Sequence, residues 1–155
     1  RSAMTGYRVG WVAGDPELVA IFRKTKTNID SGTPTFLQDA AVAALSEEEH
    51  VEGFRREYRA KRDILCEALV KAGLQDCTPP ATLYVWQRVP KGMSSVQFAT
   101  YLLDEKLAIV TTPGSWIAEP TENGANPGAG YLRFALVPSL EDTRRAAERL
   151  SALRF

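Results

Sequence analysis

The feature that most limits how this chain can fold is a long helical pattern between residues 46 and 73. Ser46 and Glu49 match a capping box, in which the two side chains satisfy free amides at a helix start. Gly73 suits the position just beyond a helix C-terminus, where a left-handed backbone is common. Apolar side chains recur between them at intervals of three or four or a multiple: Val51, Phe54, Tyr58, Leu65, Leu69 and Ala72. The spacing predicts one long helix with a single buried stripe.

The opposite face of this predicted helix is basic. It carries Arg55, Arg56, Arg59, Lys61 and Arg62. Acidic residues are interleaved with them, and the whole chain has 19 basic and 19 acidic residues, so its formal net charge is zero. We therefore expect a solvated helix face and no nucleic-acid partner. No apolar run is long enough to span a bilayer, so no membrane partner is expected.

The segment after Gly73 reads as a small α/β layer. Its pattern predicts a strand over 82–89, a capped helix over 94–107, strands over 108–112 and 130–137, and a closing helix over 139–154. In the 130–137 strand, alternation puts Arg133 on the same face as Tyr131, opposite Leu132 and Phe134. We expect the helices to pack on one face of the sheet.

The segment before Ser46 has a different texture. Residues 7–13 read as a strand, and Asp15 followed by Pro16 predicts a helix start. A second helix, rich in small residues, is predicted over 35–45. The domain prediction is the end of a larger domain at 1–45, a connecting helix at 46–73, and a small α/β domain at 74–155.

Few residues are available for metal or thiol chemistry. Cys66 and Cys77 lack metal-ligand spacing, and the lone histidine, His50, lies among glutamates at a helix start. No metal site is expected. Sparse cysteine usage fits a reducing compartment, which predicts a cytoplasmic protein.

Four stretches together carry a family resemblance: "MTGYRVGW" at 4–11, "TLYVWQRVP" at 82–90, "IVTTPGSWI" at 109–117 and "GYLRFALVPS" at 130–139. In order and separation they resemble the carboxyl-terminal part of the fold-type-I, pyridoxal-phosphate-dependent aminotransferases of classes I and II. The resemblance covers essentially the whole chain. It implies an α/β fold made of the end of the large domain, the long interdomain helix and the small domain. The stretch "KTNIDSGTPTFLQ" slightly resembles the diaminopimelate type, and aspartate or alanine types remain open.

The resemblance also implies where the cofactor is held. It places the lysine that forms the Schiff base with pyridoxal 5'-phosphate immediately before Arg1, so the chain itself contains no catalytic lysine. It implies that Arg8 binds the cofactor phosphate, for which a guanidinium offers a bidentate fork. The alternative for Arg8 is an arginine on a strand edge with its head in water.

Three further residues receive roles from the resemblance. Arg133 would grip the substrate α-carboxylate, with an exposed ion pair as the alternative. Thr35 would reach the cofactor phosphate of a neighbouring subunit in a homodimer, although a plain helix N-cap is the stronger interpretation of an isolated threonine. Trp116 would line the substrate pocket, or equally pack at a domain interface. Ile117 and "AEPTEN" depart from the family pattern here, which leaves substrate size open.

The resemblance implies an enzyme that transfers an amino group from an amino acid to a 2-oxo acid. Three alternatives stay open: a lyase of the same fold with the same cofactor, a non-catalytic aminotransferase-like regulatory domain, and a free-standing α/β interaction domain.

Overall fold

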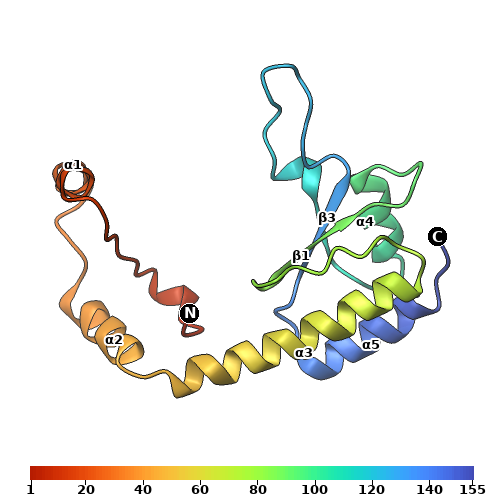
Figure 1. The fold of residues 1–155 in the computed structure, drawn as a ribbon, viewed down its shortest axis with the longest axis horizontal. Coiled ribbons are helices and arrows are strands. Elements are labelled where there is room, and N and C mark those ends of the chain that lie inside the picture. The colour runs from red at the N-terminus through yellow and green to blue at the C-terminus, as the bar shows by residue number, and fades with distance from the viewer. The chain divides into compact units, whose positions relative to one another are not determined.

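The structure, a computed structural model, describes all 155 residues and divides them into two units, Arg1–Arg55 and Arg56–Phe155 (Figure 1). The first unit contains a 3-10 turn η1 (Thr5–Tyr7), helix α1 (Pro16–Lys26), helix α2 (Thr35–Leu45) and the start of helix α3 (Glu49–Lys71). Helix α1 begins as predicted, because the Asp15 carboxylate accepts hydrogen bonds from the amides of Glu17 at 2.9 Å and Leu18 at 3.3 Å. Helix α2 occupies the predicted range.

The predicted strand over residues 7–13 is wrong. Tyr7 closes the turn η1, and residues 8–13 have no regular structure. A strand exists only where its amides and carbonyls pair with a neighbouring strand, and residues 1–55 contain no strand that could pair with this one.

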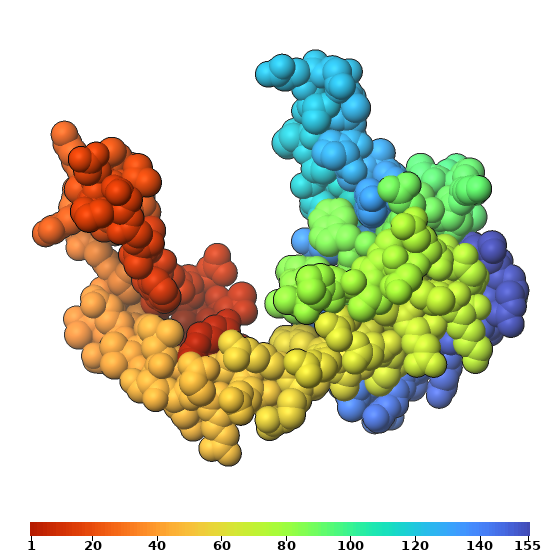
Figure 2. All heavy atoms as spheres, viewed as in Figure 1, coloured from red at the N-terminus to blue at the C-terminus, as the bar shows by residue number.

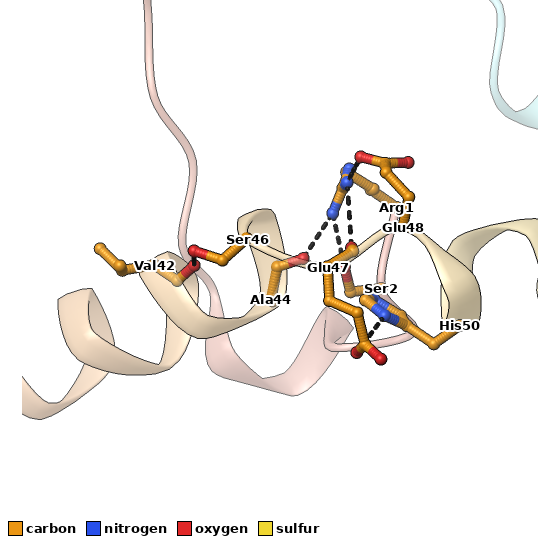
Figure 3. Close-up of polar contacts among 8 residues, drawn as sticks. All are labelled: Arg1, Ser2, Val42, Ala44, Ser46, Glu47, Glu48 and His50. Atoms are coloured by element: carbon orange, nitrogen blue, oxygen red, sulfur yellow. Dashed lines mark hydrogen bonds and ion pairs between the residues drawn. The ribbon is translucent and has the colours of Figure 1, made fainter.

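The predicted capping box at Ser46 and Glu49 is also wrong. Ser46 closes α2 instead, and its hydroxyl donates to the Val42 carbonyl at 2.8 Å (Figure 3). Helix α3 starts at Glu49, three residues beyond Ser46, so the serine is too early to cap it. The loop between the helices is closed by Arg1, whose guanidinium donates to the Ala44 carbonyl at 2.5 Å and pairs with Glu48 (Figure 3).

The second unit is built on a three-stranded antiparallel sheet in the order β1-β3-β2. The strands are β1 (Tyr84–Arg88), β2 (Thr112–Pro113) and β3 (Tyr131–Ala135). Helix α4 (Ser95–Leu103), the 3-10 turn η2 (Gly114–Trp116) and helix α5 (Leu140–Ser151) complete it. The predicted order of strands and helices is confirmed. The strand predicted over 108–112 is wrong except at Thr112, because β2 consists of Thr112 and Pro113, which pair with Arg133 and Leu132.

The helices cover one face of this sheet, as predicted. Val85, Leu132 and Phe134 are buried on that face, and the C-terminal part of α3 lies beside α5 beneath it (Figure 1). The helices contribute these side chains to the same core: Leu65, Leu69, Phe98, Leu102, Ala147 and Leu150. Burial of this apolar set is the main stabilising contribution to the unit.

The end of α3 confirms the predicted role of Gly73. Its backbone has φ = +94°, its amide donates to the Val70 carbonyl at 2.9 Å, and the Leu74 amide donates to the Leu69 carbonyl at 3.1 Å. These two bonds define a Schellman motif, which glycine forms without a steric penalty.

Two residues of the predicted basic face are not fully solvated: Arg62 is half-buried and donates to the Pro79 carbonyl, and Lys61 is buried. Lys61 is 4% exposed, and its Nζ lies 2.5 Å from a carboxylate oxygen of Glu57 and 5.4 Å from the centre of the Tyr58 ring. The charge is balanced locally, so its burial needs no further partner. Arg55, Arg56 and Arg59 are exposed, as predicted. No helix in the structure has both the length and the apolar character that crossing a membrane requires.

Candidate functional site

The face of the sheet that the helices leave uncovered carries aromatic and cationic side chains. Alternation along β1 and β3 directs Tyr84, Trp86 and Arg88, and on the neighbouring strand Tyr131 and Arg133, away from the core. Trp86 is directly opposite Arg133, and Arg88 is directly opposite Tyr131. The predicted placement of Arg133 beside Tyr131, opposite Leu132 and Phe134, is confirmed.

Arg133 is held in place without an acidic partner. Its guanidinium carbon lies 4.5 Å from the centre of the Tyr84 ring, which places the cation over the π face. One terminal nitrogen donates to the Thr112 hydroxyl at 3.4 Å, and the buried Nε–H has no hydrogen-bond partner. The hydroxyl of Thr111, the next residue along, is also buried without a partner.

Some arginines of this chain have an acidic partner, and Arg133 does not. Arg1, Arg62 and Arg145 each pair with a carboxylate. The exposed ion pair considered for Arg133 is therefore wrong, since no Asp or Glu lies within ion-pair distance of it. The side chain is half-buried, and of its two terminal nitrogens only one bonds within the chain, to Thr112, so the other is free for an acceptor that arrives from outside the chain. A carboxylate fits this donor set.

Beside this face, a braced loop connects η2 to β3 and projects from the body of the second unit (Figures 1 and 2). Asn126 braces it by donating to the Ser115 carbonyl at 3.1 Å and the Ala118 carbonyl at 2.9 Å. At its base the backbones of Gly114 and Gly128 touch, and neither position has room for a Cβ atom. The glycine at 114 is therefore required by close approach of two backbones.

Trp116 lies at the start of this loop and is 71% exposed. Its indole makes no hydrogen bond or aromatic contact within the chain, so neither predicted role for Trp116 is tested here. Ser115 beside it bonds to Ser95 at 2.9 Å between the two hydroxyl oxygens, which ties the turn to the start of α4. The turn is fixed while the indole is free.

Arg8 belongs to the first unit. Its backbone is left-handed, with φ = +52°, and its guanidinium is exposed, donating only to the Thr5 carbonyl at 3.4 Å. Of the alternative considered for Arg8, the strand edge is wrong because no strand forms there, but the head in water is confirmed by its exposure. Arg8 lines a pocket of about 470 Å³ between the 1–11 segment and α2. No Asp or Glu lines this pocket, and Arg1, its other cation, is paired with Glu48, so Arg8 is the free positive charge of a pocket that suits an anion.

Thr35 is the first residue of α2, and the N-cap position is occupied by Pro34 without any side-chain cap. The N-cap interpretation of Thr35 is therefore wrong. Pro34 occupies the N-cap position, so Thr35 is already the first residue of the helix. Its hydroxyl makes no hydrogen bond within the chain.

Sequence reasoning missed Tyr84 and Thr112, which hold Arg133. The period-two alternation in "LYVW" was the available indication, since it puts Tyr84 and Trp86 on one face. Pairing of β1 with β3 is what brings that face to Arg133, and no local pattern contains this information.

Cys66 and Cys77 are both free thiols. Burial raises the pKa of the Cys66 thiol, and a hydrogen bond with Thr78 only partly opposes this. No cluster of three or more His, Cys, Asp or Glu side chains in the structure is arranged to hold a metal ion.

This fold belongs to a known class of proteins. Residues 1–150 match the family described as aminotransferase class I and II. The chain belongs to this family, and its fold is the carboxyl-terminal portion of fold type I.

Two named relatives indicate which aminotransferases of this family the chain is similar to. The chain is 42% identical over 153 residues to the LL-diaminopimelate aminotransferase of Aquifex aeolicus, covering 98% of this chain and 38% of that protein. It is 39% identical over 151 residues to the enzyme of the same name from Nitratidesulfovibrio vulgaris, covering 97% of this chain and 37% of the relative. The chain thus spans a little over a third of the length of these relatives.

Solved structures agree with the fold. An aminotransferase from Neisseria meningitidis superimposes with a TM-score of 0.83 at 38% identity, over 97% of this chain and 37% of that one. A probable N-succinyldiaminopimelate aminotransferase from Thermus thermophilus gives a TM-score of 0.78 at 32% identity, over 96% of this chain and 38% of that one.

Proposed function

We propose that the protein containing this chain is a pyridoxal-phosphate-dependent aminotransferase that moves an amino group between an amino acid and a 2-oxo acid. Membership of the family supports the reaction. The observation that carries the proposal is the Arg133 guanidinium, which is half-buried, stacked and free of any acidic partner. Such a group suits the α-carboxylate that the amino donor and the 2-oxo acid share.

When bound, pyridoxal phosphate supplies an electron sink that lets an α-amino acid lose its α-proton. For this cofactor we propose Arg8 as a phosphate ligand, supported by its free charge in an acid-free pocket. The lysine that binds the cofactor would immediately precede Arg1. Thr35 would donate its hydroxyl to the cofactor phosphate of a second subunit in a homodimer, and Trp116 would line the substrate pocket.

The organisation follows the same proposal. Residues 1–45 would end the large cofactor-binding domain, 46–73 would form the connecting helix, and 74–155 the small domain. The names of the relatives support an amino donor of the diaminopimelate type. Free, sparse cysteines support a cytoplasmic location.

The reaction is tested by supplying the intact protein with pyridoxal phosphate, L,L-diaminopimelate as donor and 2-oxoglutarate as acceptor. A transaminase forms glutamate and needs the 2-oxo acid, whereas a lyase of the same fold forms product without it. A regulatory domain would bind the cofactor and turn over neither substrate. Absence of turnover with diaminopimelate, alanine and aspartate as donors would contradict the proposal.

The role of Arg133 is tested with Arg133→Ala. We expect the KM of both substrates to rise at least a hundredfold while the cofactor's absorption spectrum is retained, because a charge-assisted bidentate pair is lost. Arg88→Ala is the matched control, since Arg88 lies on the same sheet face and also stacks on a tyrosine. Equal effects of the two substitutions would mean that the face needs positive charge in general and not this guanidinium.

A further inference from the structure

The guanidinium of Arg133 has a defined resting position although no carboxylate holds it. Two groups supply that position: the Tyr84 ring, 4.5 Å from the guanidinium carbon, and the Thr112 hydroxyl, 3.4 Å from a terminal nitrogen. The hydroxyl contact is long for a hydrogen bond and therefore weak. The ring is the stronger constraint on the side chain.

A ring and a carboxylate use different parts of the same cation. A guanidinium is planar, so an aromatic ring occupies one face while all the N–H donors remain in the plane at the edge. An acidic partner from the protein would also fix the side chain, but it would occupy the edge and neutralise the charge. Stacking orients Arg133 and leaves its in-plane donors uncommitted: only one terminal nitrogen bonds within the chain, to Thr112, and the other makes no hydrogen bond there.

The sheet explains why Tyr84 reaches Arg133. Tyr84 pairs with Ala135 and Trp86 pairs with Arg133, so Tyr84 and Arg133 are diagonal neighbours on the uncovered face. Long and aromatic side chains meet across such a diagonal. Ala135, directly opposite Tyr84, is small.

We propose that Tyr84 is a positioning residue of the substrate site, which acts through its ring by holding the Arg133 guanidinium flat with its N–H edge free for the substrate carboxylate. This inference rests on the proposed function and adds a residue to it. The Tyr84 hydroxyl makes no hydrogen bond within the chain, so the ring alone has this role.

The first test replaces Tyr84 in the intact enzyme and measures both substrates. Tyr84→Leu should raise the KM of the amino donor and of the 2-oxo acid by about tenfold each, because a partly desolvated cation–π contact is lost from a carboxylate site that both substrates use. The kcat should change less than threefold. Tyr84→Phe keeps the ring and should stay within about twofold of the parent enzyme in both constants.

A matched control removes the equivalent contact elsewhere on the same face. Arg88 lies 5.3 Å from the centre of the Tyr131 ring, in the same kind of stack, but its terminal nitrogen also bonds to the Tyr131 hydroxyl at 2.9 Å. Because the proposed carboxylate site uses Arg133 and not Arg88, Tyr131→Leu should leave both KM values unchanged. If Tyr131→Leu and Tyr84→Leu raise KM equally, the effect comes from general loosening of the face, and the proposal is wrong.

A second measurement separates cation–π attraction from simple packing. Phenylalanines with one, two and three ring fluorines at position 84 keep nearly the same size, while each fluorine withdraws electron density from the ring face. The dissociation constant of glutarate, an unreactive carboxylate, measured by calorimetry, should rise stepwise along this series. A constant value across the series would overturn the proposal, even if Tyr84→Leu fails to fold.

Failure of the inference and failure of the proposed function give different results. If the parent enzyme does not transaminate, the proposed function fails whatever the variants do. If the parent enzyme transaminates while Tyr84→Leu leaves KM and glutarate binding unchanged, only the positioning role is refuted.

Discussion

Gly128→Ala should destabilise the second unit, because two stretches of backbone touch at this position. A Cβ atom built on Gly128 lies 2.5 Å from the carbonyl carbon of Gly114 and 2.9 Å from the Ala118 side chain. Separations below 3.0 Å are essentially never shown by real Cβ atoms. The obstructing atoms at Gly114 belong to backbone, so the base of the projecting loop must shift as a whole. We expect a loss of about 1–3 kcal/mol, as for other insertions into close-packed sites.

Gly130→Ala is the matched control in the same segment. A Cβ atom there meets nothing within 4 Å, and the backbone of Gly130 is not left-handed. Because alanine restricts the unfolded chain more than glycine does, this variant should be unchanged or more stable by up to about 1 kcal/mol.

The assay is urea unfolding of the intact protein, followed by circular dichroism and tryptophan fluorescence. A loss of about 2 kcal/mol with an m-value of about 2 kcal/mol per molar urea lowers the midpoint by about 1 M. The reasoning is refuted if the midpoints of Gly128→Ala and Gly130→Ala coincide, since the two differ only in the space around the added methyl group.

Two further predictions concern titratable groups. A hydrogen bond from the Ser139 hydroxyl and an ion pair with Arg145 lower the pKa of the Asp142 carboxyl below its ordinary 3.8, so its stabilising contribution is present above that pH and is lost as pH falls through the lowered pKa. In unfolding curves measured over a pH series, Asp142→Asn should therefore reduce stability at pH 7 but not at the acid end. A stability difference that stays constant across the series would count against this account. Burial raises the pKa of the Cys66 thiol, so a colorimetric thiol reagent at pH 8 should modify the partly exposed Cys77 first and Cys66 only on unfolding. The Cys77→Ser variant, which retains Cys66, should therefore be labelled more slowly than Cys66→Ser, which retains Cys77. Equal labelling rates would contradict this.

Several elements could be predicted because their determinants are local. Asp15 and Pro16 start α1, Gly73 ends α3, and the alternation in β3 separates Arg133 from Leu132. In each case the residue type and its immediate neighbours decide the backbone conformation or the face. The family resemblance rested on short motifs in a fixed order across the whole chain, and the family match over residues 1–150 confirms it.

The wrong predictions share a dependence on distant partners or on helix register. Residues 7–13 have strand composition but no strand to pair with, and Ser46 bonds to the helix behind it instead of the helix ahead. Lys61 carries a surface side chain that packing buries beside Glu57. Local pattern specifies what a segment prefers, and not which neighbour it meets.

For the candidate site, the sequence by itself determined that an arginine at position 133 stands on the polar face of a strand, whereas it placed Arg8 in a strand that does not form. Only the tertiary structure decided what surrounds them. Antiparallel pairing of β1 with β3 brings the Tyr84 ring onto the Arg133 guanidinium, and the contact between Gly114 and Gly128 sets the loop beside that strand. The physical reason is that residue spacing fixes the direction of a side chain along one strand, whereas its partners are set by strand register and backbone approach over tens of residues.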